Sequence, residues 1–170
     1  MATHSEINKL VLHTAAYEGS DYDIEDIDQW HRDRGWMMVG YHYFILKDGT
    51  VQRGREDHMI GAHVKGHNTG SLGICIQGHG DYEEWTPEQW DAVVALCIRK
   101  MDEYDIPVEE IYGHRAFTDM KTCPGELVDM NEVREQIDLA AIAPIEPVPV
   151  EPPENIRVAT IDELSDEIKS

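Results

Sequence analysis

Residues 7–13 read INKLVLH, an apolar and partly β-branched run that ends on a histidine. Such a run is typical of a buried strand. A second apolar run, LGICIQ at residues 72–77, is bounded by glycine and predicts a central strand. Segments with helical periodicity alternate with these strands. The sequence therefore predicts an α/β fold, in which a central mixed β-sheet is flanked by helices.

The segments around these strands contain start and stop signals. Thr86-Pro87-Glu88-Gln89 predicts the beginning of a helix, because threonine can cap it, proline suits its first turn and glutamine completes a capping box. Asp48-Gly49 is a tight-turn pair that predicts a hairpin. We expect helices over 24–34, 86–104 and 131–141, hairpin strands over 41–47 and 50–53, a long loop over 55–70, and a brief strand over 110–112.

Length and charge limit the possible functions. The 170 residues fit one domain, and 14 basic against 34 acidic side chains give a net charge of −20. Such a surface repels polyanions, so we expect no nucleic-acid binding and no attraction to anionic membranes. No run approaches the length of a membrane span, so we expect no membrane insertion. The first 15 residues do not resemble a secretory signal, so we expect synthesis in a cytoplasm.

The composition changes at residue 144. Five of the eight prolines lie between Pro144 and Pro153, which is typical of an extended, semi-rigid linker. Residues 160–168 are acidic, with apolar residues at helical spacing, and could form a short amphipathic helix. We therefore divide the chain into a domain over 1–143 and a tail over 144–170. This tail could pack on the domain, bind a partner or fray.

Three side chains far apart in the sequence suit a metal ion. His13 ends the first predicted strand, His114 follows the last one, and Cys123 lies nine residues later. Two imidazoles and one thiolate are a ligand set for Zn²⁺ that leaves a fourth position for water. By spacing alone, the simpler interpretation is two packed or surface histidines and a small buried thiol, because no recognised metal-binding pattern has this spacing. An odd count of three cysteines makes a disulfide framework improbable, and Cys75 and Cys97 are expected to be reduced core thiols.

Several segments, in order, resemble one known superfamily over about residues 7–137. It is the zinc amidase superfamily of phage lysozyme-type endolysins and peptidoglycan-recognition proteins. The similar segments are LVLHTAA (10–16), GWMMVGYHYFILKDGTVQRGR (35–55), GAHVKGHNTGSLGICIQG (61–78), TPEQWDAVVALC (86–97), YGHRAF (112–117) and KTCPG (121–125). The range from 7 to 137 is about three-quarters of the chain, and several similar segments in order make the resemblance far more specific than any single motif.

The resemblance implies a single amidase domain of the peptidoglycan-recognition type and N-acetylmuramoyl-L-alanine amidase activity. This reaction hydrolyses the amide between N-acetylmuramic acid and L-alanine of peptidoglycan. The matching positions imply that His13, His114 and Cys123 bind zinc and that Tyr41 and Lys121 are catalytic. Residues expected to contact substrate or orient groups around the metal are His63, His42, Trp36, Asn68 and Arg115. The remaining histidines, His31, His58, His67 and His79, are expected at the surface.

Two other functions stay open at this stage. Some relatives bind peptidoglycan without cleaving it and have lost the cysteine ligand, so Cys123 favours catalysis. Short phage amidases can also inhibit a phage RNA polymerase, and the sequence does not decide this. We expect a monomer, made in the host cytoplasm and released to the periplasm or cell wall at lysis. Because anionic wall polymers would repel a protein of this charge, we expect a Gram-negative target or a saline setting.

Overall fold

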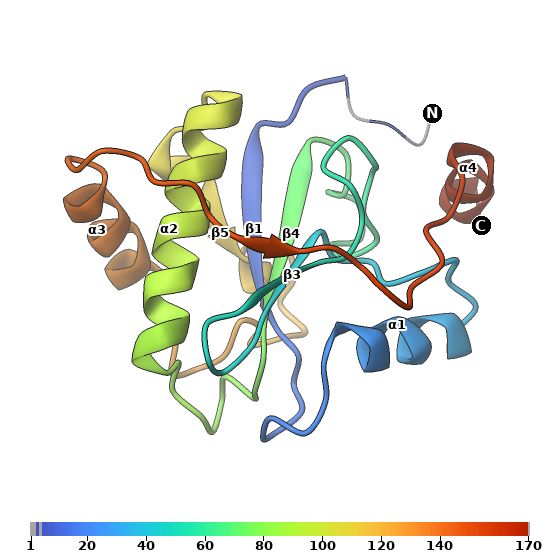
Figure 1. Ribbon diagram of the computed structural model, residues 1–170, viewed down its shortest axis with the longest axis horizontal. Coiled ribbons are helices and arrows are strands. Elements are labelled where there is room, and N and C mark those ends of the chain that lie inside the picture. Colours follow the sequence, from blue (N-terminus) through green and yellow to red (C-terminus); the bar gives the residue numbers. More distant parts are fainter. Residues whose placement is uncertain (1–2, 4, 170) are drawn as a thin grey trace.

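The computed structural model describes residue 3 and residues 5–169, and it contains a six-stranded mixed sheet in the order β5-β1-β4-β2-β3-β6 (Figure 1). The central strand β1 lies parallel to both β4 and β5, and β2 lies parallel to β4. The pair β2–β3 is antiparallel, as in a hairpin, and β6 lies parallel to β3. The bounds are β1 Lys9–Thr14, β2 Tyr43–Ile45, β3 Val51–Arg53, β4 Ser71–Ile76, β5 Ile111–Gly113 and β6 Val150–Glu151.

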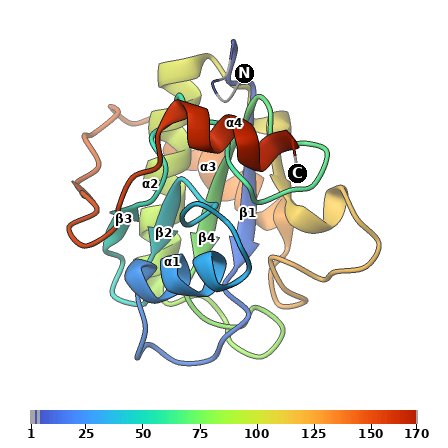
Figure 2. The same cartoon turned by 90° about the vertical axis from the view of Figure 1, so that its right-hand side faces the viewer.

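Helices cover both faces of this sheet (Figures 1 and 2). Helices α2 and α3 lie on one face, and α1 and α4 lie on the other. The bounds are α1 Ile24–Asp33, α2 Pro87–Tyr104, α3 Met130–Ala140 and α4 Ile161–Lys169, with two short 3-10 helices at Val108–Glu110 and His114–Ala116. The expected α/β fold is therefore confirmed. Within the described residues, none of the helices has both the length and the apolarity that a membrane crossing requires.

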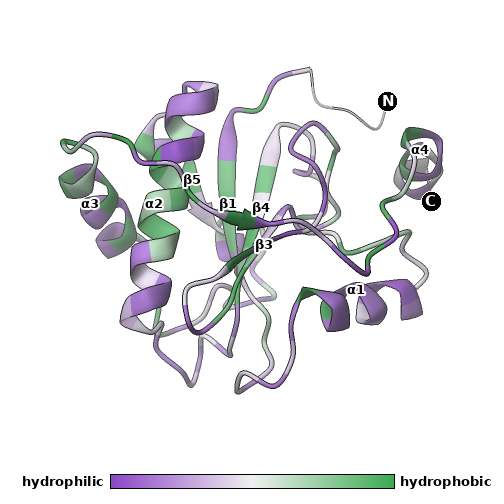
Figure 3. Ribbon diagram, viewed as in Figure 1, coloured by the Kyte–Doolittle hydropathy of each residue, from purple (hydrophilic) through white to green (hydrophobic). Residues whose placement is uncertain are grey.

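Two hydrophobic clusters fill the spaces between sheet and helices. Strand β2 contributes to both, because successive side chains of a strand point to opposite faces. Tyr43 and Ile45 pack toward α2 and α3, whereas Phe44 packs toward α1 and α4. Figure 3 shows hydrophobic residues along the central strands and a mixture of both kinds on the helices.

The helix signals in the sequence act as expected. The Thr86 side chain accepts from the Gln89 amide, the Gln89 side chain accepts from the Thr86 amide, and Pro87 occupies the first turn of α2. The strand expected over 41–47 is shorter, at Tyr43–Ile45. The chain just before it is irregular because its carbonyl groups bond to the long loop and not to a neighbouring strand. The Gly40 carbonyl accepts from the Ala62 amide, and the Tyr41 carbonyl accepts from the Arg55 amide.

The described part of the tail, residues 144–169, packs on the rest of the chain. Its strand β6 extends the sheet beside β3, and its helix α4 lies on the same face of the sheet as α1 (Figure 2). Three tail residues, Ile156, Ala159 and Leu164, are buried in the cluster between the sheet and α1. Of the three alternatives for the tail, the structure shows packing on the domain. The division at residue 143/144 stays a prediction about which part folds alone.

A buried ionic network joins α2 to the long loop on the side of the sheet that faces α2. The Asp57 carboxylate accepts from Tyr43 Oη at 2.5 Å, Lys100 Nζ at 2.7 Å and Tyr104 Oη at 2.6 Å. Burial alone would raise the pKa of Asp57, but these three hydrogen bonds outweigh it and lower the pKa below its usual range. Asp57 therefore stabilises the fold only while it is ionised.

Replacing Asp57 by asparagine is expected to lower the free energy of unfolding by about 3 kcal/mol near neutral pH, because Lys100 loses its buried partner. A carboxyl group with a depressed pKa contributes stability above its unfolded pKa of about 4, and the contribution is lost as the pH falls through the lower folded pKa. The difference between wild type and variant should therefore shrink as the pH falls below about 4.

Urea unfolding at neutral pH and at about pH 3 measures this difference. Glu103→Gln is the matched control, because Glu103 pairs with the same lysine but is 40% exposed. It should cost less than about 1 kcal/mol. An equal loss for Asp57→Asn at both pH values would contradict the assignment.

Candidate active site

The three candidate metal ligands meet at one edge of the sheet. His13 lies on β1 and His114 directly follows β5, and because these strands are parallel neighbours their carboxyl ends share an edge. Cys123 reaches the same point from the loop that follows. The ligand atoms of the three residues lie within 4.8 Å of one another, and Cys123 Sγ lies 3.8 Å from His13 Nδ1. This donor set and spacing fit one tetrahedral Zn²⁺ with a position left for water.

A chain of hydrogen bonds determines which nitrogen of His13 faces that point. The Ser71 hydroxyl donates to the carbonyl of His67 at 2.8 Å, so Ser71 Oγ accepts from His63 Nε2 at 3.2 Å. His63 Nδ1 is then unprotonated and accepts from His13 Nε2 at 2.9 Å. His13 Nδ1 consequently keeps its lone pair, which is the form that binds a metal.

His63 lies against the backbone of β4, where a side chain at Gly73 would collide with it. A Cβ atom at Gly73 would lie 2.6 Å from the His63 ring. Glycine at this position therefore allows the His63 ring to reach His13. His63 thus contacts a candidate metal ligand directly. Its role in orienting groups around the metal and its contact with substrate both stay predictions.

Burial keeps the imidazoles neutral. It lowers the pKa of His13 and His63 well below the usual value, and for His13 the nearness of the His114 imidazole and of the Lys121 ammonium adds to the effect, because either group, when charged, would repel a second positive charge. Burial and Lys121 also lower the pKa of His114. Burial raises the pKa of the Cys123 thiol to about 11, although the Thr14 amide donates to its sulfur at 3.3 Å. A metal would therefore have to displace the thiol proton on binding.

The loop that contains Cys123 is braced by two side chains. Arg115 donates to the backbone carbonyls of Gly125 at 2.7 Å and Val128 at 2.5 Å. Asp81 accepts from the Thr122 hydroxyl at 2.9 Å and from the Glu126 amide at 2.8 Å. The guanidinium of Arg115 is thus used to shape the loop, and its expected contact with substrate stays a prediction. The sequence contained no signal for Asp81, which lies some 40 residues before this loop.

Tyr41 lies beside the metal ligands. Its ring centroid is 5.0 Å from that of His13 and 5.5 Å from that of His31. Burial, followed by the nearby thiols of Cys75 and Cys123, raises the pKa of Tyr41 well above its usual value. The phenol therefore keeps its proton and can act as a hydrogen-bond donor.

One expectation about the histidines is wrong. His31 is buried rather than at the surface, because its Nδ1 accepts from the Gly40 amide at 2.9 Å and its ring packs against Trp36 at 4.4 Å. His58 and His67 are exposed, as expected, and His79 is half-buried. Trp36 is also half-buried, and its contact with substrate stays a prediction.

His42 and Asn68 shape the long loop. His42 Nδ1 accepts from the Gly73 amide at 3.0 Å, so its Nε2 donates to the carbonyl of Met59 at 2.7 Å. Asn68 Oδ1 accepts from the amides of His63 and Val64 at 2.9 and 2.8 Å. Both residues place the loop that contains His63. Their contact with substrate stays a prediction.

Lys121 is exposed and lies two residues before Cys123. Its ammonium group is close enough to contribute to the lowered pKa values of His13 and His114. An exposed cation near the ligand set is suited to stabilise a negatively charged oxygen there.

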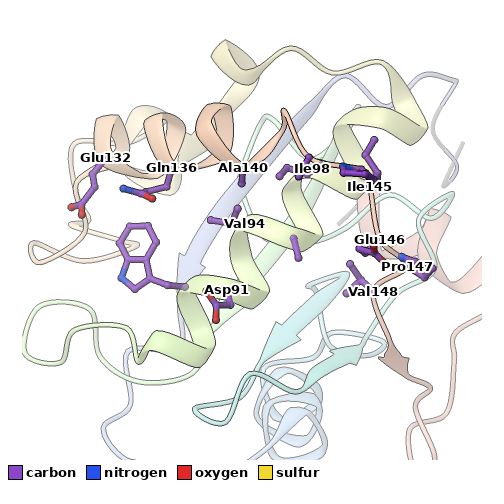
Figure 4. A pocket seen from close by; sticks show the side chains of 14 residues that line it. Asp91, Val94, Ile98, Glu132, Gln136, Ala140, Ile145, Glu146, Pro147 and Val148 are labelled. Carbon is purple, nitrogen blue, oxygen red and sulfur yellow. The ribbon is translucent and has the colours of Figure 1, made fainter.

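A cavity of about 570 Å³ lies elsewhere, between α2, α3 and the beginning of the tail (Figure 4). Its lining is largely apolar and includes Val94, Ile98 and Val148, with carboxylates such as Glu132 at its rim. None of the candidate ligands or catalytic residues lines it. The chemistry of the protein is therefore expected at the sheet edge and not in this cavity.

Comparisons with known proteins find similar sequences and structures. The endolysin of Enterobacteria phage K11 is 34% identical over 125 residues, which are 70% of this chain and 81% of that protein. The amidase LysC from Clostridium intestinale URNW has a similar structure, with a TM-score of 0.72 and 31% identity over 78% of this chain and 86% of that chain. A complex of peptidoglycan-recognition proteins LCa and LCx with bound tracheal cytotoxin gives a TM-score of 0.68 and 28% identity, over 74% of this chain and 81% of that chain.

The family described as N-acetylmuramoyl-L-alanine amidase matches residues 3–126, a range that contains the three candidate ligands, Tyr41 and Lys121. The match also spans β1 to β5 and the long loop. This chain therefore belongs to the N-acetylmuramoyl-L-alanine amidase family.

Proposed function

We propose that this protein is a zinc-dependent, endolysin-type amidase that cleaves the bond between N-acetylmuramic acid and L-alanine of peptidoglycan and thereby lyses a host cell. The observation that supports the metal most directly is the convergence of His13, His114 and Cys123 within 4.8 Å. The hydrogen-bond chain through His63 adds to it, because it leaves the metal-facing nitrogen of His13 unprotonated.

A zinc ion held by these ligands would supply a water that ionises near neutral pH and a Lewis acid for the scissile carbonyl. The surrounding side chains have separate tasks. The protonated Tyr41 hydroxyl would donate a hydrogen bond toward the reacting oxygen or pass a proton to the leaving amine. The Lys121 ammonium would stabilise the negative charge that develops on the carbonyl oxygen.

The second candidate is a module that binds peptidoglycan without cleaving it. One of the similar structures holds tracheal cytotoxin, so binding is within the repertoire of this fold. The thiol of Cys123 distinguishes the two functions, because a complete ligand set is required for catalysis and not for binding alone. The presence of Cys123 beside His13 favours the enzyme.

Metal analysis combined with mass spectrometry of digested peptidoglycan tests the proposal. We expect about one zinc ion per chain and released stem peptides with a free N-terminal L-alanine. Binding of peptidoglycan with no released peptide would support the second candidate. Inhibition of a phage RNA polymerase stays an open alternative, which a pull-down with the cognate polymerase would test. A monomeric state stays a prediction, which a measurement of solution mass would test.

Lys121→Ala is expected to lower kcat by roughly 10²-fold, because one donor to the developing oxyanion is lost. Zinc content should not change, since the lysine is not a ligand. Lys65→Ala is the matched control, because Lys65 is also exposed but lies in the long loop. Wild-type turnover in Lys121→Ala would remove this residue from the mechanism.

The charge of −20 predicts a preference among cell walls. At low ionic strength, we expect faster clearing of Gram-negative sacculi than of walls rich in anionic teichoic acids, because the latter repel the protein. The decrease in turbidity of each wall suspension, followed at two salt concentrations, measures the two clearing rates. Added salt should reduce the difference between these rates, because it screens the repulsion. Faster clearing of the teichoic-acid-rich walls at low salt would contradict the prediction.

A further inference from the structure

The segment over 37–41, which ends on Tyr41, belongs to no regular strand or helix, and its residues 38–40 are buried. Buried backbone groups outside regular structure need other partners. The Val39 amide donates to Asp28 Oδ1 at 2.6 Å, and the Gly40 amide donates to His31 Nδ1 at 2.9 Å. Both partners are side chains of α1. The position of Tyr41 therefore depends on side chains that come from other elements.

Arg55 holds the other side of this segment. Its side chain is completely buried, and its Nε donates to the carbonyl of Val39 at 3.0 Å while its Nη1 donates to the carbonyl of Ile60 at 2.9 Å. Its backbone amide donates to the carbonyl of Tyr41 at 3.0 Å. A single residue thus ties the segment before Tyr41 to the long loop that leads to His63.

The charge of Arg55 is balanced by the tail. Glu167 of α4 lies with Oε1 and Oε2 at 3.0 and 2.9 Å from Arg55 Nη2, although the two residues are 112 positions apart. Burial lowers the pKa of Arg55, and Glu167 is the strongest of the groups that act in the opposite direction. A buried guanidinium that loses its ion-pair partner is strongly unfavourable. Asp28 also acts on Arg55 but less strongly, so loss of Glu167 is expected to disturb the position of Arg55.

Glu167 also contacts the segment directly. The Met37 amide donates to Glu167 Oε1 at 3.3 Å. Helix α4 is held in place by the buried Leu164 and by the backbone of Ala159, whose amide lies 3.4 Å from Met38 Sδ. One carboxylate of α4 therefore contacts the first residue of the segment and, through Arg55, holds its centre.

We infer that Glu167 is a positioning residue for Tyr41, and that α4 supports the active site through Arg55 and the Met37 amide. The inference rests on the proposed function, because it assigns the effect on turnover to the hydroxyl of Tyr41. It also makes a structural claim about the segment over 37–41 that holds with or without enzymatic activity.

Glu167→Gln tests the inference, because it removes the charge and nearly preserves the shape. We expect kcat to fall roughly 10- to 100-fold, the scale of a small misplacement of a catalytic group, with unchanged zinc content and little change in KM. Glu163→Gln is the matched control on the same helix, since Glu163 pairs with Arg157 at the surface. It should keep wild-type turnover. Wild-type kcat in Glu167→Gln would overturn the inference.

A double-mutant cycle separates positioning from a general loss of structure. If Glu167 acts through the hydroxyl of Tyr41, Glu167→Gln should lower kcat much less in the Tyr41→Phe background than in wild type. An equal fold-change in both backgrounds would overturn the inference. Rates are compared per folded molecule, at a temperature well below the melting transition of each variant.

Hydrogen exchange provides a readout that needs no activity. Glu167→Gln should speed exchange of the Val39 and Gly40 amides, and Glu163→Gln should not. This result would stand even if the wild-type protein failed to hydrolyse peptidoglycan, so the two proposals can fail separately. Unchanged exchange in Glu167→Gln would overturn the structural claim.

If Glu167→Gln does not fold, the double variant Arg55→Met with Glu167→Met removes both buried charges together. It should fold and bind zinc but keep a reduced kcat, because Val39 has lost its donor. Wild-type kcat in this double variant would show that Arg55 and Glu167 only stabilise the fold, and would overturn the inference.

Discussion

Cys123→Ser is expected to abolish hydrolysis and to weaken zinc binding by more than about 100-fold. The serine hydroxyl stays protonated near neutral pH and is a poor zinc ligand, whereas the thiol can lose its proton to the metal. Loss of a residue that only supports a ligand costs 10- to 100-fold in affinity, so loss of a ligand itself should exceed that range. Zinc affinity by competition with a chelator, and release of stem peptide, measure the two effects.

The matched control is Cys97→Ser, the same chemical change on the face of α2 that packs against the sheet. It should lower the melting temperature, because a hydroxyl replaces a buried thiol, but it should keep the zinc and the activity. Full hydrolysis by metal-free Cys123→Ser would refute the zinc mechanism. Equal losses of zinc in both variants would show that the effect comes from instability and not from ligation.

Tyr41→Phe is expected to lower kcat by about 10²- to 10⁴-fold, the usual range for a group that transfers or donates a proton in the transition state. The change removes only the hydroxyl, and the ring can keep its packing against His13 and His31. Zinc content and the melting temperature should therefore stay close to those of the wild type. Steady-state kinetics on purified peptidoglycan, together with metal analysis, checks this result.

Tyr43→Phe is the control for Tyr41→Phe, because Tyr43 lies two residues away in β2 and its hydroxyl bonds to Asp57 on the side of the sheet that faces α2. It should destabilise the fold while leaving kcat unchanged. A normal turnover number in Tyr41→Phe would assign proton transfer to another group.

Much of the fold could be predicted because its signals are local. The capping box of Thr86 and Gln89 acts between residues three apart, and the apolar run from Leu10 to Leu12 reports a strand buried on both faces. Such patterns depend only on the period of a helix or strand, and the structure has both elements within a residue or two of their expected bounds. The long loop over 55–70 was likewise recognisable from its glycines and its lack of any period.

The site was only partly accessible to this kind of reasoning. His13, His114 and Cys123 were identified through similarity to a family, since no spacing rule joins residues 110 positions apart. The expectation that His31 lies at the surface was wrong. Its ring is buried where its Nδ1 accepts a hydrogen bond from the Gly40 amide. The residues that flank His31 and Gly40 in the sequence do not indicate this hydrogen bond.

The sequence by itself determined the alternation of strands and helices, the acidic surface and the donor atoms available for a metal. Only the tertiary structure decided which nitrogen of His13 faces the ligand set, and that the tail neutralises Arg55. The physical reason is the range of the interactions. Periodicity and capping act within one or two turns, whereas the contacts of His13 with His63 and of Arg55 with Glu167 span 50 and 112 residues and exist only once the sheet has assembled.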